Sequence, residues 1–140
     1  MFELSDVPED VEENLAFRKE IREWADTGLR RDAICDYIKS AGFDGFHFFL
    51  KAFCWLHEPR PRLINRVRSP NTIPFIPWPD QLAAARQIMD PENFGMRDIG
   101  IEKSRGLGAT WIVLMIFLHE WRTQPLCTYG VVSRNEDAVD

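Results

Sequence analysis

Apolar residues recur at helical spacing in the first sixty residues and predict three helices. Asp6 and Pro8 suit the start of the first helix. That helix is predicted from apolar residues at about 3.6-residue spacing: Val11, Leu15, Ile21 and Trp24. Gly28 follows as a stop. A second helix is predicted around residues 33–38, and it is expected to end near Gly42.

The third predicted helix, from about Asp44 to Leu56, differs from the others because it is apolar on most of its surface. Its large apolar residues are Phe46, Phe48, Phe49, Leu50, Phe53 and Trp55. A helix of this kind is buried on several sides or covers a neighbour. Since exposed apolar area usually marks an interface, a partner-docking face is the alternative interpretation.

The pattern changes after the third helix. Six prolines lie between Pro59 and Pro79, which excludes a regular helix there and predicts an extended connector along the surface. Helical spacing returns from Gln81 to Met89, where Pro79 and Asp80 suit the first turn.

The last forty residues predict a strand, a glycine-containing turn, a helix and a second strand. The strands are expected at 98–102 and 127–133, and the helix from about Ala109 to Arg122, where Pro125 ends it. This order is one βαβ unit, the building block of parallel sheets. A parallel sheet needs several strands covered on both faces, and only two are evident. We therefore expect uncovered apolar surface and self-association.

Composition limits the class of protein. With 45% hydrophobic residues among 140, the chain has material for a packed core, and its net charge of −5 argues against a protein that coats nucleic acid. Three cysteines without a CxxC pair predict reduced thiols in a cytosolic protein.

The longest apolar run, Thr110 to Leu118, is far shorter than the roughly 20 residues that span a membrane, so we expect a soluble protein. Three histidines share no metal-binding spacing: His47, His57 and His119.

The turn before the last predicted helix has features of a phosphate-binding loop. Backbone amides and the positive end of a helix can bind phosphate at such a junction. The standard loop ends in Gly-Lys-Ser/Thr, but here Ala109 stands between Gly108 and Thr110 where the lysine belongs. Lys103 or Arg105 could supply the cation instead, and Thr110 the hydroxyl for magnesium. An ordinary glycine-containing turn is the alternative.

Four segments resemble the large terminase subunits, the ATPases that pump phage DNA into capsids. The run EKSRGLGATW resembles the deviant Walker A motif of that family, and TIPFIPWPDQ is similar to its adenine-contacting element. The second match implies that Gln81 reads the adenine edge, with Phe75 or Trp78 packed close by. Upstream and downstream, FHFFLKAFCWLHEPR and GVVSRNEDAVD resemble the segments that flank the family's nucleotide site. The matches follow the expected order over residues 46–140.

The resemblance implies an α/β fold and a set of ligands. A helical region (1–58) and a proline-rich connector (59–79) would precede the incomplete start of a P-loop NTPase parallel-sheet domain (80–140). ATP and Mg²⁺ would be the ligands, with Thr110 on the metal and Lys103 favoured over Arg105 as the phosphate cation. The implied nucleotide-binding residues are Gln81, Lys103, Ser104, Arg105, Gly106, Gly108, Ala109 and Thr110. For the full-length protein, the resemblance implies the small terminase subunit, the portal and double-stranded DNA as partners, a ring homo-oligomer, and the host cytoplasm.

The acids of a working ATPase are not evident in the sequence. The resemblance implies a Walker B strand ending in paired acids and a nuclease domain with clustered carboxylates. Glu136, Asp137 and Asp140 do not end a strongly apolar run, so no catalytic residue is assigned and ATP hydrolysis by this chain is not expected. Two alternatives stay open: a non-enzymatic helical interaction module built on residues 1–56, and a fragment of another P-loop NTPase such as a helicase.

Overall fold

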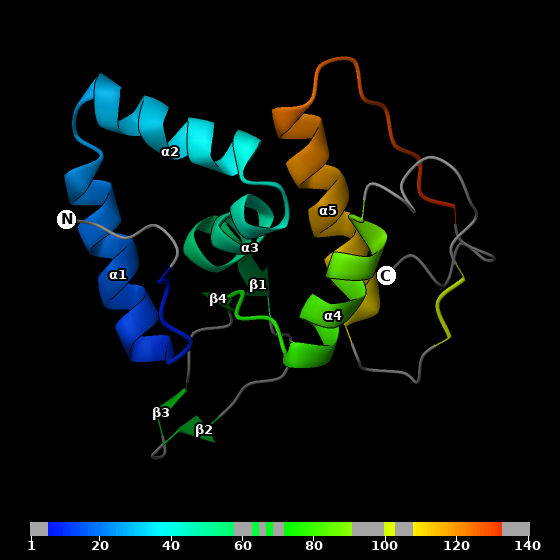
Figure 1. Ribbon diagram of the computed structural model, residues 1–140. Coiled ribbons are helices and arrows are strands. Elements are labelled where there is room, and N and C mark those ends of the chain that lie inside the picture. Colours follow the sequence, from blue (N-terminus) through cyan, green and yellow to red (C-terminus); the bar gives the residue numbers. More distant parts are fainter. Residues whose placement is uncertain are drawn as a thin grey trace.

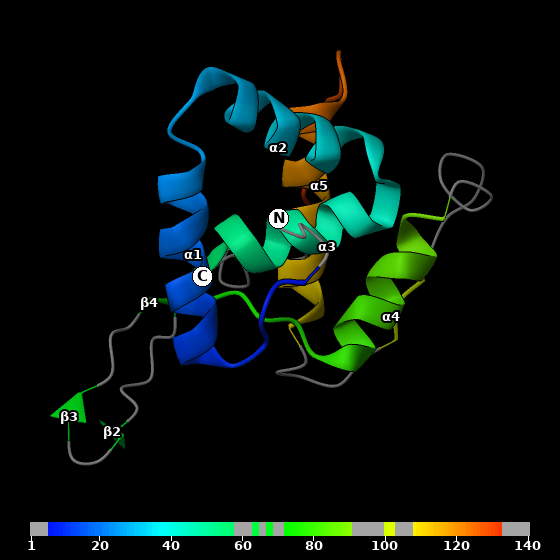
Figure 2. The ribbon, with the colours of Figure 1, turned by 60° about the vertical axis from the view of Figure 1, so that its left-hand side comes forward.

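Helices make up most of the computed structural model, which describes residues 6–57, 63–64, 67–68, 72–90, 100–102 and 108–132. The described helices are α1 (Val11–Trp24), α2 (Gly28–Ser40), α3 (Gly42–Phe53), α4 (Pro79–Ile88) and α5 (Ala109–Thr123). In Figure 1, α3 lies at the centre, with α1 and α2 to one side and α4 and α5 to the other. In Figure 2, a turned view, α5 passes behind α3, and α1 and α4 lie on opposite sides of it. The predicted helices are therefore confirmed, with changes at their ends.

Capping residues set two of the helix starts. α1 begins after Asp10, whose carboxylate accepts hydrogen bonds from the amides of Glu12 and Glu13 at 2.9 and 3.1 Å. The start predicted at Asp6 was therefore too early. α2 begins directly after Thr27, at Gly28, so this glycine opens the second helix as well as following the first.

Two short antiparallel strand pairs lie between α3 and α4. β1 (Trp55–His57) pairs with β4 (Thr72–Pro74), and β2 (Leu63–Ile64) pairs with β3 (Val67–Arg68). The prediction that α3 continues to Leu56 was wrong, because the chain leaves the helix after Phe53 and its backbone pairs with β4 instead. The connector also does not stay on the surface, since Phe75 directly after β4 is only 1% exposed.

A buried polar cluster joins the end of α3 to α1. Arg18 of α1 donates from Nη2 to the carbonyl oxygens of Lys51 and Cys54 at 2.6 and 2.8 Å, and from Nε to Oδ1 of Asn14 at 2.7 Å. Asn14, which is fully buried, also donates to the carbonyl of Lys51 at 3.2 Å. Burial lowers the pKa of Arg18 to about 10 and raises the pKa of the Cys54 thiol to about 12. These bonds satisfy carbonyls at the end of α3 that the helix leaves without partners.

The core lies on opposite sides of α3. One cluster gathers Phe46, Leu50, Cys54, Phe75, Ala85, Ile112 and Ile116. The other gathers Val7, Phe17, Ile21, Ile34, Phe48 and Ala52. α3 therefore contributes to both clusters, and its predicted burial on several sides is confirmed. The first cluster also joins α3 to α4 and α5, so the hydrophobic core crosses from the helical region into residues 80–140.

The two predicted C-terminal strands are not formed where the structure describes them. Residues 100–102 and 127–132 belong to no strand, because no described segment offers them a hydrogen-bonding partner. Both segments still lie along α5: Ile101 and Val131 line one hollow beside this helix, and Tyr129 stacks on Phe117 with ring centres 4.6 Å apart. The described chain thus combines helices with small antiparallel strand pairs, and its described residues contain no parallel sheet.

None of the described helices combines the length and apolar character that crossing a membrane requires.

Replacing Arg18 with alanine should destabilise the fold strongly. The change leaves the carbonyls of Lys51 and Cys54 without their charged donor, and we expect the free energy of unfolding to fall by about 2–4 kcal/mol. Urea denaturation followed by circular dichroism measures this. Arg22→Ala is the matched control, because Arg22 is an exposed arginine one turn further along α1. This substitution should change the free energy of unfolding by less than about 0.5 kcal/mol. Equal effects of both substitutions would show that the buried bonds do not hold α3.

Removing residues 71–140 should abolish cooperative folding of the first seventy. The deletion takes away Phe75, Ile112 and Ile116, which cover Phe46 and Leu50 on α3. We expect a shallow urea transition and a helical signal below that of three intact helices. A chain of residues 1–124 keeps this cover and should unfold cooperatively. A sharp transition in residues 1–70 would contradict the shared core.

Candidate nucleotide site between α4 and α5

Two segments far apart in the sequence meet where α4 and α5 begin. Gln81 lies in the first turn of α4, and its Oε1 accepts a hydrogen bond from the amide of Trp78 at 2.9 Å. Gly108 directly precedes α5. A Cβ atom placed on Gly108 would lie 2.6 Å from Nε2 of Gln81, which means that the glutamine amide packs against the bare backbone of this glycine.

Gly108 is required for a second reason. Its φ of +67° lies in the left-handed region, which side chains with a Cβ rarely adopt. Gly108 offers no side chain to cap α5, and no other side chain caps the start of this helix among the described residues. Within the described ranges, the first amides of α5 therefore have no side-chain acceptor, and free amides at a helix start favour an anion.

A cavity of about 180 Å³ lies beside this contact. Trp78, Asp80 and Gln81 line it from the start of α4, and Glu102 and Ala109 line it from the other side. Its remaining walls are apolar side chains of Ala84, Ile88, Ile101 and Ile112. This cavity is smaller than the roughly 300–1,000 Å³ typical of sites for drug-sized ligands, so it has room for part of such a molecule.

The structure separates the two aromatic candidates for the adenine element. Phe75 is buried in the core with Phe46 and Leu50 and is not accessible to a ligand. Trp78 lines the cavity and is 57% exposed. Of the two, Trp78 alone can pack against a bound base.

The structure reaches the predicted phosphate loop only at its end. Gly108, Ala109 and Thr110 are described, and Thr110 is exposed in the first turn of α5. Four of the predicted site residues lie outside the described residues: Lys103, Ser104, Arg105 and Gly106. The choice between Lys103 and Arg105 as the phosphate cation therefore stays a prediction.

Thr110 fits one part of a magnesium site. Its exposed hydroxyl could bind a Mg²⁺ ion that is itself held by phosphates. The described residues contain no group of three or more His, Cys, Asp or Glu side chains that could hold a metal ion by themselves.

Two histidines, the buried His119 and the half-buried His47, lie among the residues that pack around α3. His119 of α5 is 3% exposed, its Nε2 lies 3.1 Å from the carbonyl oxygen of Ile38, and its ring packs against Phe46 and Phe49. Burial, followed by the nearby charge of Lys51, lowers the pKa of His47. Neither histidine lines the cavity.

Sequence reasoning missed the two carboxylates of the cavity, Asp80 and Glu102. Asp80 precedes Gln81, and Glu102 precedes the predicted loop, so both were visible as neighbours of motif residues. Their negative charges disfavour a phosphate group inside the cavity. The cavity therefore suits an uncharged group, and an anion belongs nearer to the start of α5.

Comparisons of the chain with models of known protein families, with curated proteins and with solved structures found no match. The assignment of function therefore rests on the residues of the site.

Replacing Gly108 with alanine should destabilise the α4–α5 contact. The left-handed backbone costs alanine about 1–2 kcal/mol, and the new methyl group would also displace the amide of Gln81. We expect a loss of at least about 1 kcal/mol in the free energy of unfolding, measured by urea denaturation. Gly130→Ala is the control, because a Cβ there meets no atom within 4 Å. A loss no larger than that of the control would show that this backbone geometry is not needed.

Proposed function

We propose that the chain is the nucleotide-binding N-terminal part of a viral DNA-packaging motor ATPase, a terminase large subunit. The observation that carries the proposal is the packing of Gln81 against Gly108. The resemblance assigns Gln81 to the adenine-contacting element and Gly108 to the phosphate loop, two motifs whose residues here are 27 positions apart in the sequence. Their contact gives a single ligand the means to touch both motifs.

The adenine base enters the cavity between α4 and α5. Trp78 offers an exposed ring face, and the apolar side chains of Ala84, Ile88 and Ile112 bury the edge of the base. Gln81 carries both a donor and an acceptor, which is what recognition of an adenine edge requires. Asp80 and Glu102 do not oppose this arrangement because adenine is uncharged.

The phosphates lie toward the start of α5. There the helix dipole, the amides that follow Gly108 and the hydroxyl of Thr110 favour an anion with its magnesium ion. Lys103 supplies the positive charge that the standard lysine would provide, and Ser104, Arg105, Gly106 and Ala109 complete the loop. ATP and Mg²⁺ are therefore the proposed ligands.

Binding without hydrolysis is the expected activity of this chain. No residue is assigned to polarise an attacking water or to complete the metal site, and both are needed for phosphoryl transfer. Packaging by the full-length protein would involve the small terminase subunit, the portal, double-stranded DNA and a ring of subunits. Docking through Phe46 and Phe48 of α3 receives no support, since both side chains are buried.

Titration with a fluorescent ATP analogue in the presence of Mg²⁺ tests the proposal. We expect saturable binding that ATP displaces more readily than GTP does. Gln81→Ala should weaken binding about tenfold, the equivalent of one good hydrogen bond, and should reduce the preference for ATP. Lys103→Ala combined with Arg105→Ala should weaken binding to ATP and GTP alike.

Gln87→Ala is the matched control, because Gln87 lies on the same helix and does not line the cavity. The affinity of the Gln87→Ala variant for the ATP analogue should equal that of the unchanged chain. Absence of saturable binding in a folded sample, or binding that neither the Gln81 nor the Lys103/Arg105 substitutions affect, would refute the proposed function.

A further inference from the structure

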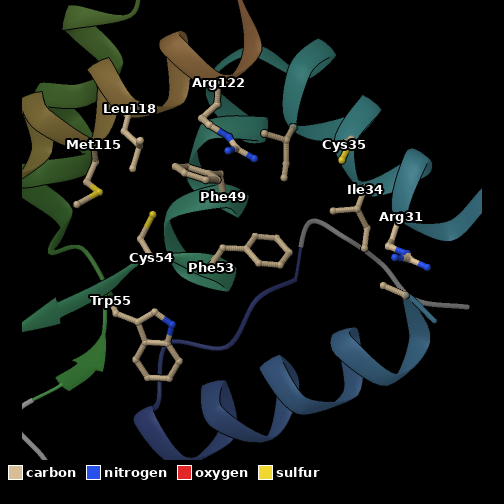
Figure 3. A pocket seen from close by; sticks show the side chains of 12 residues that line it. Arg31, Ile34, Cys35, Phe49, Phe53, Cys54, Trp55, Met115, Leu118 and Arg122 are labelled. Carbon is tan, nitrogen blue, oxygen red and sulfur yellow. The ribbon is translucent and has the colours of Figure 1, made fainter. Parts of the chain in front are cut away.

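A groove on the other half of α5 lies over α3 and is walled by α2 and α5 (Figure 3). Its volume is about 650 Å³. A second hollow of about 480 Å³ continues it toward α1, and the two hollows share Arg31, Phe53 and Trp55 as lining residues. None of these residues lines the cavity beside Gln81.

The floor of the groove is apolar and partly open to solvent. Phe53 is 40% exposed, Trp55 43% and Leu118 38%, and Phe49 and Met115 lie among them. Large apolar side chains that gather in one exposed groove usually mark a binding site. Tryptophan and arginine are also the residues that contribute most to protein–protein binding energy.

Positive charge surrounds this floor. Two arginines line the groove, Arg31 from α2 and Arg122 from α5, and two more from α1, Arg18 and Arg22, line the second hollow that continues it. Figure 3 shows Arg122 extending from α5 toward Phe49. None of the described lining residues is acidic, although the whole chain carries a net charge of −5. The concentration of arginines is therefore a property of this surface.

Arg18 adds a buried charge at the second hollow. It is 7% exposed, and its hydrogen-bond partners are two carbonyl oxygens and one amide oxygen, none of which carries a negative charge. Its Nη1 is buried without a partner among the described residues. No described carboxylate forms an ion pair with the other three arginines either. Within the described part of the chain, no carboxylate within ion-pair distance therefore offsets the positive charge around this apolar floor.

We propose that this groove binds an amphipathic helix of a partner protein, with an apolar face against Phe49, Phe53 and Leu118 and with Asp or Glu side chains against the arginines. Grooves between helices commonly take a partner helix in this way. Charge complementarity selects an acidic helix over a basic one. A nucleic acid backbone could meet the arginines, but it would leave the aliphatic part of the floor without contacts. This inference does not depend on the proposed nucleotide site.

The test uses the full chain and a panel of fluorescein-labelled helical peptides. Each peptide carries leucine or phenylalanine at i, i+3, i+4 and i+7, flanked by glutamate, and a matched set carries lysine in place of glutamate. Fluorescence anisotropy should show saturable binding of an acidic peptide that weakens as salt rises, and little binding of its lysine counterpart. Arg31→Glu combined with Arg122→Glu should weaken the acidic peptide at least tenfold and strengthen the basic one.

Lys39→Glu is the matched charge reversal, because Lys39 is an exposed residue of α2 outside the groove. It should leave peptide binding unchanged, and circular dichroism should show that all variants are folded. Equal binding of acidic and basic peptides, no binding of any acidic peptide, or equal effects of both charge reversals would overturn the proposal.

Self-association that only the Arg31/Arg122 variant loses would assign the groove to a second copy. An arginine-dependent preference for a DNA oligonucleotide over the acidic peptides would assign it to nucleic acid, and either result would also overturn the proposal.

Discussion

The hydrogen bonds from Arg18 to the end of α3 determine the course of the rest of the chain. By satisfying the carbonyls of Lys51 and Cys54, Arg18 lets α3 stop at Phe53, and the guanidinium also lies 4.4 Å above the ring of Trp55 in β1. β1 then pairs with β4, which brings the connector back to α3 and puts Phe75 into the core. α4 begins a few residues later, so the position of Gln81 beside α5 depends on a contact made by α1.

The helices could be predicted from the sequence because their signals are local. Apolar spacing gave α1, α2 and α5, and Pro79 marked the start of α4. The end of α3 could not be predicted, since it depends on Arg18, more than thirty positions earlier. The three-residue strands are too short for an alternating pattern, and their pairing joins residues 55–57 to 72–74. The opposite error was made near the C-terminus, where strand-like composition has no described strand to pair with.

The candidate site was only partly visible in the sequence. The residue types at Gly108 and Thr110 indicated a loop before a helix, and the structure has a left-handed glycine at that point. The contact between Gln81 and Gly108 is tertiary and has no local signal. The sequence also left Phe75 and Trp78 as equal candidates, because both are aromatic residues on one proline-rich segment. Burial separates them: Phe75 is in the core, whereas Trp78 lines the cavity.

Charge divides the two sites that share α5. Ala109 and Ile112, at the start of the helix, line a cavity with two carboxylates, whereas Leu118 and Arg122, near its end, line a groove with arginines and no described acid. The two carboxylates disfavour an anionic group in the cavity, and the arginines attract one to the groove. The two sites are therefore expected to bind ligands of different charge. Between them, Ile116 is fully buried against α3. Because closely packed side chains leave little room for independent movement, a displacement of α5 at one site would also shift the residues of α5 that line the other site. Ligands at the two sites would be thermodynamically coupled only if each bound one position of α5 more tightly than another.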